Sequence, residues 1–243
     1  MYKITRPHST LLLFLLMIVL FSSCKKENDP LIPSTLTNGC KLDFLQTNQE
    51  FRAKLTELEE DARKLNYETG YLLYRSATRR FSYEKIEGNT GEASIIFSPT
   101  RQLDGIIHSH YGDLYPNFSG SDIKMIYEAY YFEQMNDFEN FISVVVFGSG
   151  ISYLLKITDL ERFLNFSKNN LTNRDSFAAF ETRYHNIQVK GLANFGVNGS
   201  FENALLEMLN TSGLTLYKSF APYQTWIRLQ RDGMGKTQTQ PCW

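Results

Sequence analysis

Apolar residues follow two spacings along this chain, one typical of helices and one typical of strands. From Phe51 to Leu65 they recur at intervals of four and three residues, which places them on one face of a helix. A second helical pattern begins near Ser121. Short apolar runs that indicate strands lie at 71–74, 93–97, 105–109, 141–147 and 153–157. We therefore expect an α/β fold with a mixed β-sheet flanked by helices.

The last third of the chain continues this mixture of helices and strands. Its apolar spacing predicts helices at 175–184 and 201–209 and a short strand at 214–217. We expect a core domain of residues 42–165, and a C-terminal α/β extension of residues 166–243 that packs on this core.

The N-terminus has a pattern of its own. Two basic residues precede the apolar run 11–21, which is too short to cross a bilayer but suits the centre of a signal peptide. The sequence Leu20-Phe-Ser-Ser-Cys24 resembles a bacterial lipobox, in which the signal is cut before a cysteine that is then acylated. We expect residues 1–23 to be a lipoprotein signal peptide and Cys24 to be lipidated. A plain cleaved secretory signal is the alternative.

A polar segment with prolines, residues 24–41, follows the cysteine and predicts a flexible tether. Several acyl chains on Cys24 would anchor the protein firmly, so the membrane is an expected partner. We expect a lipid-anchored protein of the cell envelope, with the outer membrane favoured and the membrane face left open.

Composition and charge exclude little, but they give no support for a nucleic-acid partner. The formal net charge is −1, and basic residues form no stripe along the chain. About 200 residues remain after the signal and the tether, which is enough for one sizeable core.

The cysteines divide into two groups. If Cys24 is lipidated, Cys40 and Cys242 remain near the two ends of the folded part, in a compartment where disulfides persist. Because chain ends often lie close together, a Cys40–Cys242 disulfide is a reasonable hypothesis. Two free thiols are the alternative.

Candidate metal ligands cluster around the strand predicted at 105–109. His108 and His110 are two residues apart, so an extended strand would place both on one face. Asp122 follows in the first turn of a predicted helix, where the helix N-terminus favours an ionised carboxylate. A catalytic zinc site takes three such nitrogen or oxygen ligands. The alternatives are histidines without a metal, and Ser119 with Asp122 as a helix cap only.

The same segment resembles the H-x-H…S-x-x-D signature of JAMM (JAB/MPN-type) metalloproteases, and the resemblance spans about residues 48–158. It implies a JAMM/MPN-like fold in which His108, His110 and Asp122 bind Zn²⁺. It also implies that Ser119 helps to stabilise the tetrahedral intermediate.

A glutamate upstream completes the resemblance. The family's usual setting is a glutamate at a helix end before a strand, and Tyr67-Glu68-Thr-Gly70 followed by apolar residues is similar to it. This implies that Glu68 is the catalytic base. Eight residues separate the second histidine from the serine where the family usually has seven, so Ser121 is a competing hydroxyl.

These features together predict a hydrolase. The resemblance implies a membrane-anchored, zinc-dependent metallopeptidase or isopeptidase that cleaves an amide bond in a peptide or protein through a metal-activated water. Export makes envelope peptides, peptidoglycan-type cross-links or a protein the expected substrates. The alternative is a non-catalytic, protein-binding lipoprotein on a JAMM scaffold.

Overall fold

The described part of the chain forms one compact unit. A computed structural model describes residues 40–76, 80–112 and 116–242. The predicted signal peptide, Cys24 and nearly all of the tether lie outside these described residues. Within them, no helix combines the length and apolar character needed to span a bilayer.

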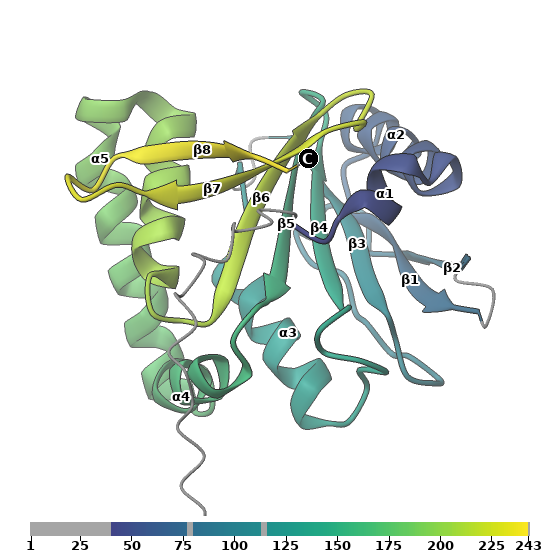
Figure 1. Cartoon of the computed structure of the whole chain (residues 1–243), viewed down its shortest axis with the longest axis horizontal. Coiled ribbons are helices and arrows are strands. Elements are labelled where there is room, and N and C mark those ends of the chain that lie inside the picture. The colour runs from purple at the N-terminus through teal and green to yellow at the C-terminus, as the bar shows by residue number, and fades with distance from the viewer. Residues whose placement is uncertain (1–39, 77–79, 113–115, 243) are drawn as a thin grey trace, which may run out of the picture. The chain divides into compact units, whose positions relative to one another are not determined.

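One mixed sheet of eight strands organises the described residues, in the order β2-β1-β3-β4-β5-β6-β7-β8 (Figure 1). Strands β3 and β4 run parallel, and the other neighbouring pairs are antiparallel. The strands are β1 (Thr69–Arg75), β2 (Phe81–Glu87), β3 (Gly105–His110), β4 (Ile142–Phe147), β5 (Ile151–Ile157), β6 (Leu214–Phe220), β7 (Trp226–Arg231) and β8 (Thr237–Pro241).

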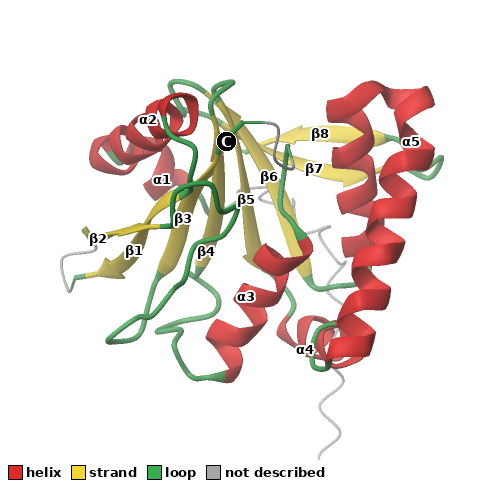
Figure 2. Ribbon diagram, turned by 180° about the vertical axis from the view of Figure 1, so that it is seen from behind, coloured by secondary structure: helices red, strands yellow, loops and turns green. Residues whose placement is uncertain are grey.

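Helices cover both faces of this sheet. Helices α1 and α2 pack on one face, while α3, α4 and α5 pack on the other (Figure 2). Helix α5 is interrupted at Gly196, whose φ of 66° is not helical. The helices are α1 (Asp43–Thr47), α2 (Gln49–Lys64), α3 (Gly120–Tyr131), α4 (Leu160–Asn170) and α5 (Arg174–Leu209).

The central strands are buried on both sides, which explains their continuous apolar runs. In β4, Val144 and Val146 face the core under α1 and α2, whereas Val145 faces the core under α3, α4 and α5. The same alternation in β3 puts Ile107 on the α2 side and Ile106 on the α3 side. Residues at even positions of β3 therefore point toward α3.

Several predicted elements are present close to their expected bounds. The helix predicted from Phe51 to Leu65 is α2, and the helix predicted near Ser121 is α3. The apolar runs 141–147 and 153–157 form the antiparallel pair β4 and β5.

The strand predicted at 93–97 is wrong, because this segment is irregular and belongs to no sheet. Strand β1 pairs with β2 on one side and with β3 on the other, so neither of its edges is free. In the segment 93–97, the side chain of Ile96 is exposed (79% accessible), which shows that this run is not a core strand.

The chain after residue 165 extends the sheet. Strand β6 pairs with β5 along its whole length, from Ile151↔Phe220 to Ile157↔Leu214. Cys40 and Cys242 form a disulfide with their Cα atoms 5.2 Å apart. The C-terminal end of the chain therefore lies beside the start of α1 (Figure 1).

Candidate metal centre

Two histidines project from the end of β3 toward α3. His108 and His110 are two residues apart on the strand, and their exposed fractions are 0% and 5%. Their Nε2 atoms lie 3.1 Å apart. Two imidazole nitrogens therefore face the same point inside the protein.

Asp122 reaches this point from the first turn of α3. Its Oδ1 lies 3.1 Å from Nε2 of His108, and its Oδ2 lies 3.5 Å from Nε2 of His110. The helix starts here because Ser119 is its N-cap. Ser119 Oγ accepts a hydrogen bond from the Asp122 N–H (3.2 Å), and the Ser119 N–H donates to Asp122 Oδ2 (2.7 Å). The capping box thus orients the carboxylate toward the histidines.

The spacing of the nitrogen and oxygen atoms of these three residues fits a small divalent cation. Ligands about 2.0–2.1 Å from a tetrahedral ion are separated from one another by about 3.3 Å. The observed separations of 3.1, 3.1 and 3.5 Å lie close to that value. The buried group of His108, His110 and Asp122 could therefore hold a metal ion.

The charge state of Asp122 also suits a cation. Burial alone would raise the pKa of this carboxyl, but the two imidazoles beside it hold the pKa well below its usual value. The carboxylate is therefore ionised at neutral pH although only 12% of its side chain is exposed. His108 Nδ1, on the far side of the ring, has no hydrogen-bond partner among the described residues.

Glu68 lies beside the three ligands without belonging to them. It is 6% exposed, directly precedes β1, and its Oε1 is 3.8 Å from Nε2 of His110. Burial raises the pKa of Glu68, and the two histidines oppose this effect. A carboxylate that binds a proton more readily than usual, next to a cation site, is suited to general base and acid chemistry.

A cavity of about 660 Å³ opens onto the site. Glu68, His110, Ser119 and Asp122 line its polar part. Apolar side chains from the irregular segment 93–97, from β3 and from α3 line much of the rest, together with the polar side chains of Glu128, Gln134 and Glu181. Residues 93–97, which the sequence predicts as a strand, thus form an irregular wall of this cavity.

Both candidate serines line the cavity, but their roles in α3 differ. Ser119 Oγ donates to Asp122 Oδ2 at 2.7 Å, so its proton is used within the helix cap. Ser121 lies in the first turn of α3 and is exposed.

Helix α5 holds the loop that leads into α3. The buried Tyr184 hydroxyl contacts Asn117 Oδ1 (2.8 Å) and the Phe118 carbonyl (3.0 Å), immediately before Ser119. The sequence indicated no functional part for this tyrosine. Its only signal was an aromatic residue inside a helical pattern, which is equally typical of a core.

No protein-family model matches this chain, and no curated protein or solved structure matches it either.

Proposed function

We propose that this protein is a zinc-dependent metallopeptidase or isopeptidase that hydrolyses an amide bond in a peptide or protein. The observation that carries the proposal is the convergence of Glu68 with His108, His110 and Asp122 at one end of the cavity. Three of these groups match a catalytic zinc ligand set, and the fourth matches a base that stands beside the metal. A JAMM-like catalytic domain is the form of this proposal that the H-x-H…S-x-x-D spacing supports.

Each residue has a defined task in this proposal. His108, His110 and Asp122 would hold the ion, and a bound zinc ion would supply the Lewis acidity that makes water nucleophilic near neutral pH. Glu68 would accept a proton from the attacking water and deliver it to the leaving amine. Ser119 would keep Asp122 oriented through the capping box, and its hydroxyl or that of Ser121 would face the carbonyl of the substrate.

The shape of the cavity supports a peptide substrate. Its apolar wall at 93–97 and its polar end at the metal ligands would receive an apolar side chain and a reacting amide, respectively. The proposed lipid anchor at Cys24 would confine this chemistry to the cell envelope. Loss of fatty-acid labelling in a Cys24→Ala variant would support the anchor, and unchanged labelling would exclude it.

A binding function is the second candidate. The Ser119 hydroxyl already donates a hydrogen bond to Asp122 in the helix cap, although the proposed catalysis would use a serine hydroxyl to contact the substrate. A non-catalytic, protein-binding lipoprotein on the same scaffold would tolerate this arrangement.

Elemental analysis tests the metal first. We expect about one zinc per chain in the parent protein, loss of zinc in His110→Ala and full zinc in Glu68→Gln. This result would separate ligand from base. A folded parent that takes up no zinc, even when zinc is supplied, would exclude the metallopeptidase.

A peptide screen then separates catalysis from binding. For a peptidase, the zinc-loaded parent cleaves at least one peptide of a mixed library, and Glu68→Gln cleaves it at least 100-fold more slowly. If parent and Glu68→Gln bind the same protein equally and neither cleaves it, the binding function is correct.

A further inference from the structure

Behind the two histidines, on the opposite face of β3, Ser109 contacts the residue that follows Glu68. We propose that Ser109 and Thr69 are positioning residues that set the place of Glu68 relative to the metal ligands. This inference rests on the proposed function. Neither side chain lies in the cavity, so neither would touch a substrate.

The contact between Ser109 and Thr69 is reciprocal. The backbone N–H of Thr69 donates to Ser109 Oγ (3.0 Å), and Ser109 Oγ donates to the backbone carbonyl of Thr69 (3.2 Å). Both residues are 0% exposed, so water does not compete for these hydrogen bonds. A single hydroxyl thus holds both backbone polar groups of the residue next to Glu68.

This hydroxyl acts where the regular pairing of β1 with β3 stops. The last paired residues at this end are Gly70 and His108. One step further along, the Ser109 side chain makes the contacts with Thr69. The start of β1, and with it Glu68, is therefore attached to the histidine strand through Ser109.

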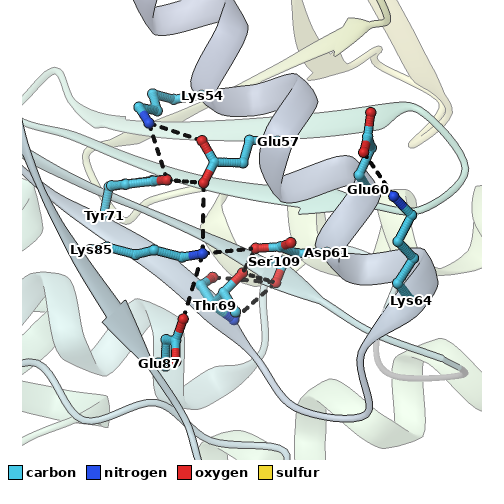
Figure 3. A network of polar contacts seen from close by, with 10 residues as sticks. All are labelled: Lys54, Glu57, Glu60, Asp61, Lys64, Thr69, Tyr71, Lys85, Glu87 and Ser109. Atoms are coloured by element: carbon cyan, nitrogen blue, oxygen red, sulfur yellow. Dashed lines mark hydrogen bonds and ion pairs between the residues drawn. The ribbon is translucent and has the colours of Figure 1, made fainter.

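The side chain of Thr69 extends the attachment to α2. Figure 3 shows Thr69 and Ser109 together with Asp61 and Lys85. Thr69 Oγ1 donates to Asp61 Oδ2 (2.8 Å) and lies 3.3 Å from Ser109 Oγ, while Asp61 is 3.6 Å from the Lys85 ammonium group. The network on this face of the sheet therefore connects α2, the strands β1, β2 and β3, and the backbone beside Glu68.

The peptide group between Glu68 and Thr69 is held at its other end as well. Its carbonyl, that of Glu68, accepts a hydrogen bond from the Gly88 N–H at 2.8 Å. The peptide group directly after the glutamate is thus fixed through both its N–H and its carbonyl, and the Glu68 carboxylate stays near His110 without entering the ligand set. Because an error of about 1 Å in such a group costs about 100-fold in rate, this restraint matters for the proposed chemistry.

Five variants of the full chain, purified in detergent, test the inference. Ser109→Ala removes the hydroxyl, and Thr69→Val removes Oγ1 with little change in volume. Thr69→Ser is the conservative variant that keeps a hydroxyl, and Glu68→Gln is the reference for loss of the base. Ser152→Ala is the matched control, because Ser152 is also fully buried in a strand and donates to a neighbouring carbonyl, that of Val145 (3.0 Å).

Four quantities are measured for each variant: zinc content, kcat on a cleaved peptide, KM for that peptide, and the affinity for acetohydroxamate. Acetohydroxamate chelates zinc and donates a hydrogen bond to a carboxylate beside it, so its affinity reports the place of Glu68 without any turnover. We expect Ser109→Ala and Thr69→Val to keep zinc, to lose about 10- to 100-fold in kcat with KM changed less than about twofold, and to bind acetohydroxamate about tenfold more weakly. Thr69→Ser and Ser152→Ala should resemble the parent.

The outcomes separate the two proposals. If the parent binds zinc and acetohydroxamate but cleaves no peptide, the proposed function fails. The acetohydroxamate affinities of the variants, compared with that of the parent, then decide alone whether Ser109 and Thr69 position Glu68. If Ser109→Ala and Ser152→Ala give the same kcat and the same acetohydroxamate affinity, the positioning role is wrong. Loss of zinc in Ser109→Ala also overturns it, and a parent without zinc overturns both proposals.

Discussion

Gly70 lies directly opposite His108 across β1 and β3, and the absence of a side chain at Gly70 leaves room for the histidine. A Cβ added to Gly70 would come within 3.0 Å of the His108 Cβ and 2.6 Å of the Ile107 carbonyl oxygen. Real Cβ atoms do not approach backbone so closely, so the strands would have to move apart. The position of a metal ligand thus depends on a glycine in the neighbouring strand.

Gly70→Ala should therefore weaken metal binding. We expect a loss of about 1–3 kcal/mol of stability from overpacking, and a zinc affinity lowered about 10- to 100-fold because His108 is displaced. Zinc titration and denaturant unfolding measure the two effects.

Gly105→Ala is the control for this prediction. A Cβ at Gly105 would meet Ile142 at 2.7 Å, so the crowding is similar but lies at the other end of β3. Equal losses of zinc affinity in both variants would show that the effect is general destabilisation.

The two serines of the α3 start should differ when each is replaced by alanine. Ser119→Ala removes the N-cap and the donor to Asp122, so it should cost about 1 kcal/mol of stability and about tenfold in zinc affinity. Ser121→Ala should leave both nearly unchanged. If Ser121→Ala instead abolishes turnover while Ser119→Ala retains it, the catalytic hydroxyl is that of Ser121.

Removal of the Glu68 charge should stabilise the metal-free protein in a pH-dependent way. Burial raises the pKa of Glu68 above 4.5, its ordinary value in an unfolded chain, so folding favours its protonated form. The contribution of Glu68 to stability is greatest below the unfolded pKa and is lost as pH rises through the folded pKa. Glu68→Gln avoids this loss, so its stability relative to the parent should increase as the pH rises above about 4.5.

Urea unfolding in the presence of a chelator measures this difference. Glu161→Gln, at an exposed position of α4, is the control for loss of a carboxylate elsewhere. A stability difference that stays constant or declines with rising pH would contradict the prediction.

The contact between α5 and the loop before α3 should be important for the metal centre. Tyr184→Phe removes the hydroxyl that contacts Asn117 and Phe118, and we expect a loss of about 1–3 kcal/mol together with weaker zinc binding. Tyr153→Phe also removes a hydroxyl, the one that contacts Glu202, but not one that holds this loop. Zinc affinity should therefore fall in the first variant and not in the second.

Reduction of the disulfide should lower stability without changing the site. The Cys40–Cys242 bond closes a loop between residues 202 positions apart, and such a bond typically contributes about 2–5 kcal/mol. Thermal unfolding with and without a reductant measures the loss, with a Cys40→Ser, Cys242→Ser double variant as the control. A reductant effect in that double variant would show that another process is responsible.

Local patterns in the sequence predict the elements whose apolar residues are periodic or nearly continuous. The apolar residues of helix α2 repeat with a helical period, and β4 is apolar except at Ser143. The two histidines were placed on one face of β3 by the strand alternation alone. The approach of Glu68 to the three candidate metal ligands also depends on the register between β1 and β3, which the sequence does not show.

The missed elements share a dependence on distant partners. In β2 only Phe81 is fully buried, so its polar character hid an edge strand. The apolar run 93–97 predicts a strand, but both edges of β1 are already paired and cannot receive it. Ser109 and Tyr184 were missed for the same reason, since each acts on a segment far away in the sequence.

The continuous pairing of β5 with β6 limits how this chemistry could be moved to another protein. A fragment that ends near residue 165 would expose the β5 edge and would lack Tyr184, which holds the loop before the metal-binding helix. The candidate site is therefore not a transplantable module of the first two thirds of the chain. A designer who wished to graft it would have to carry the last third as well, although none of the three candidate metal ligands comes from there.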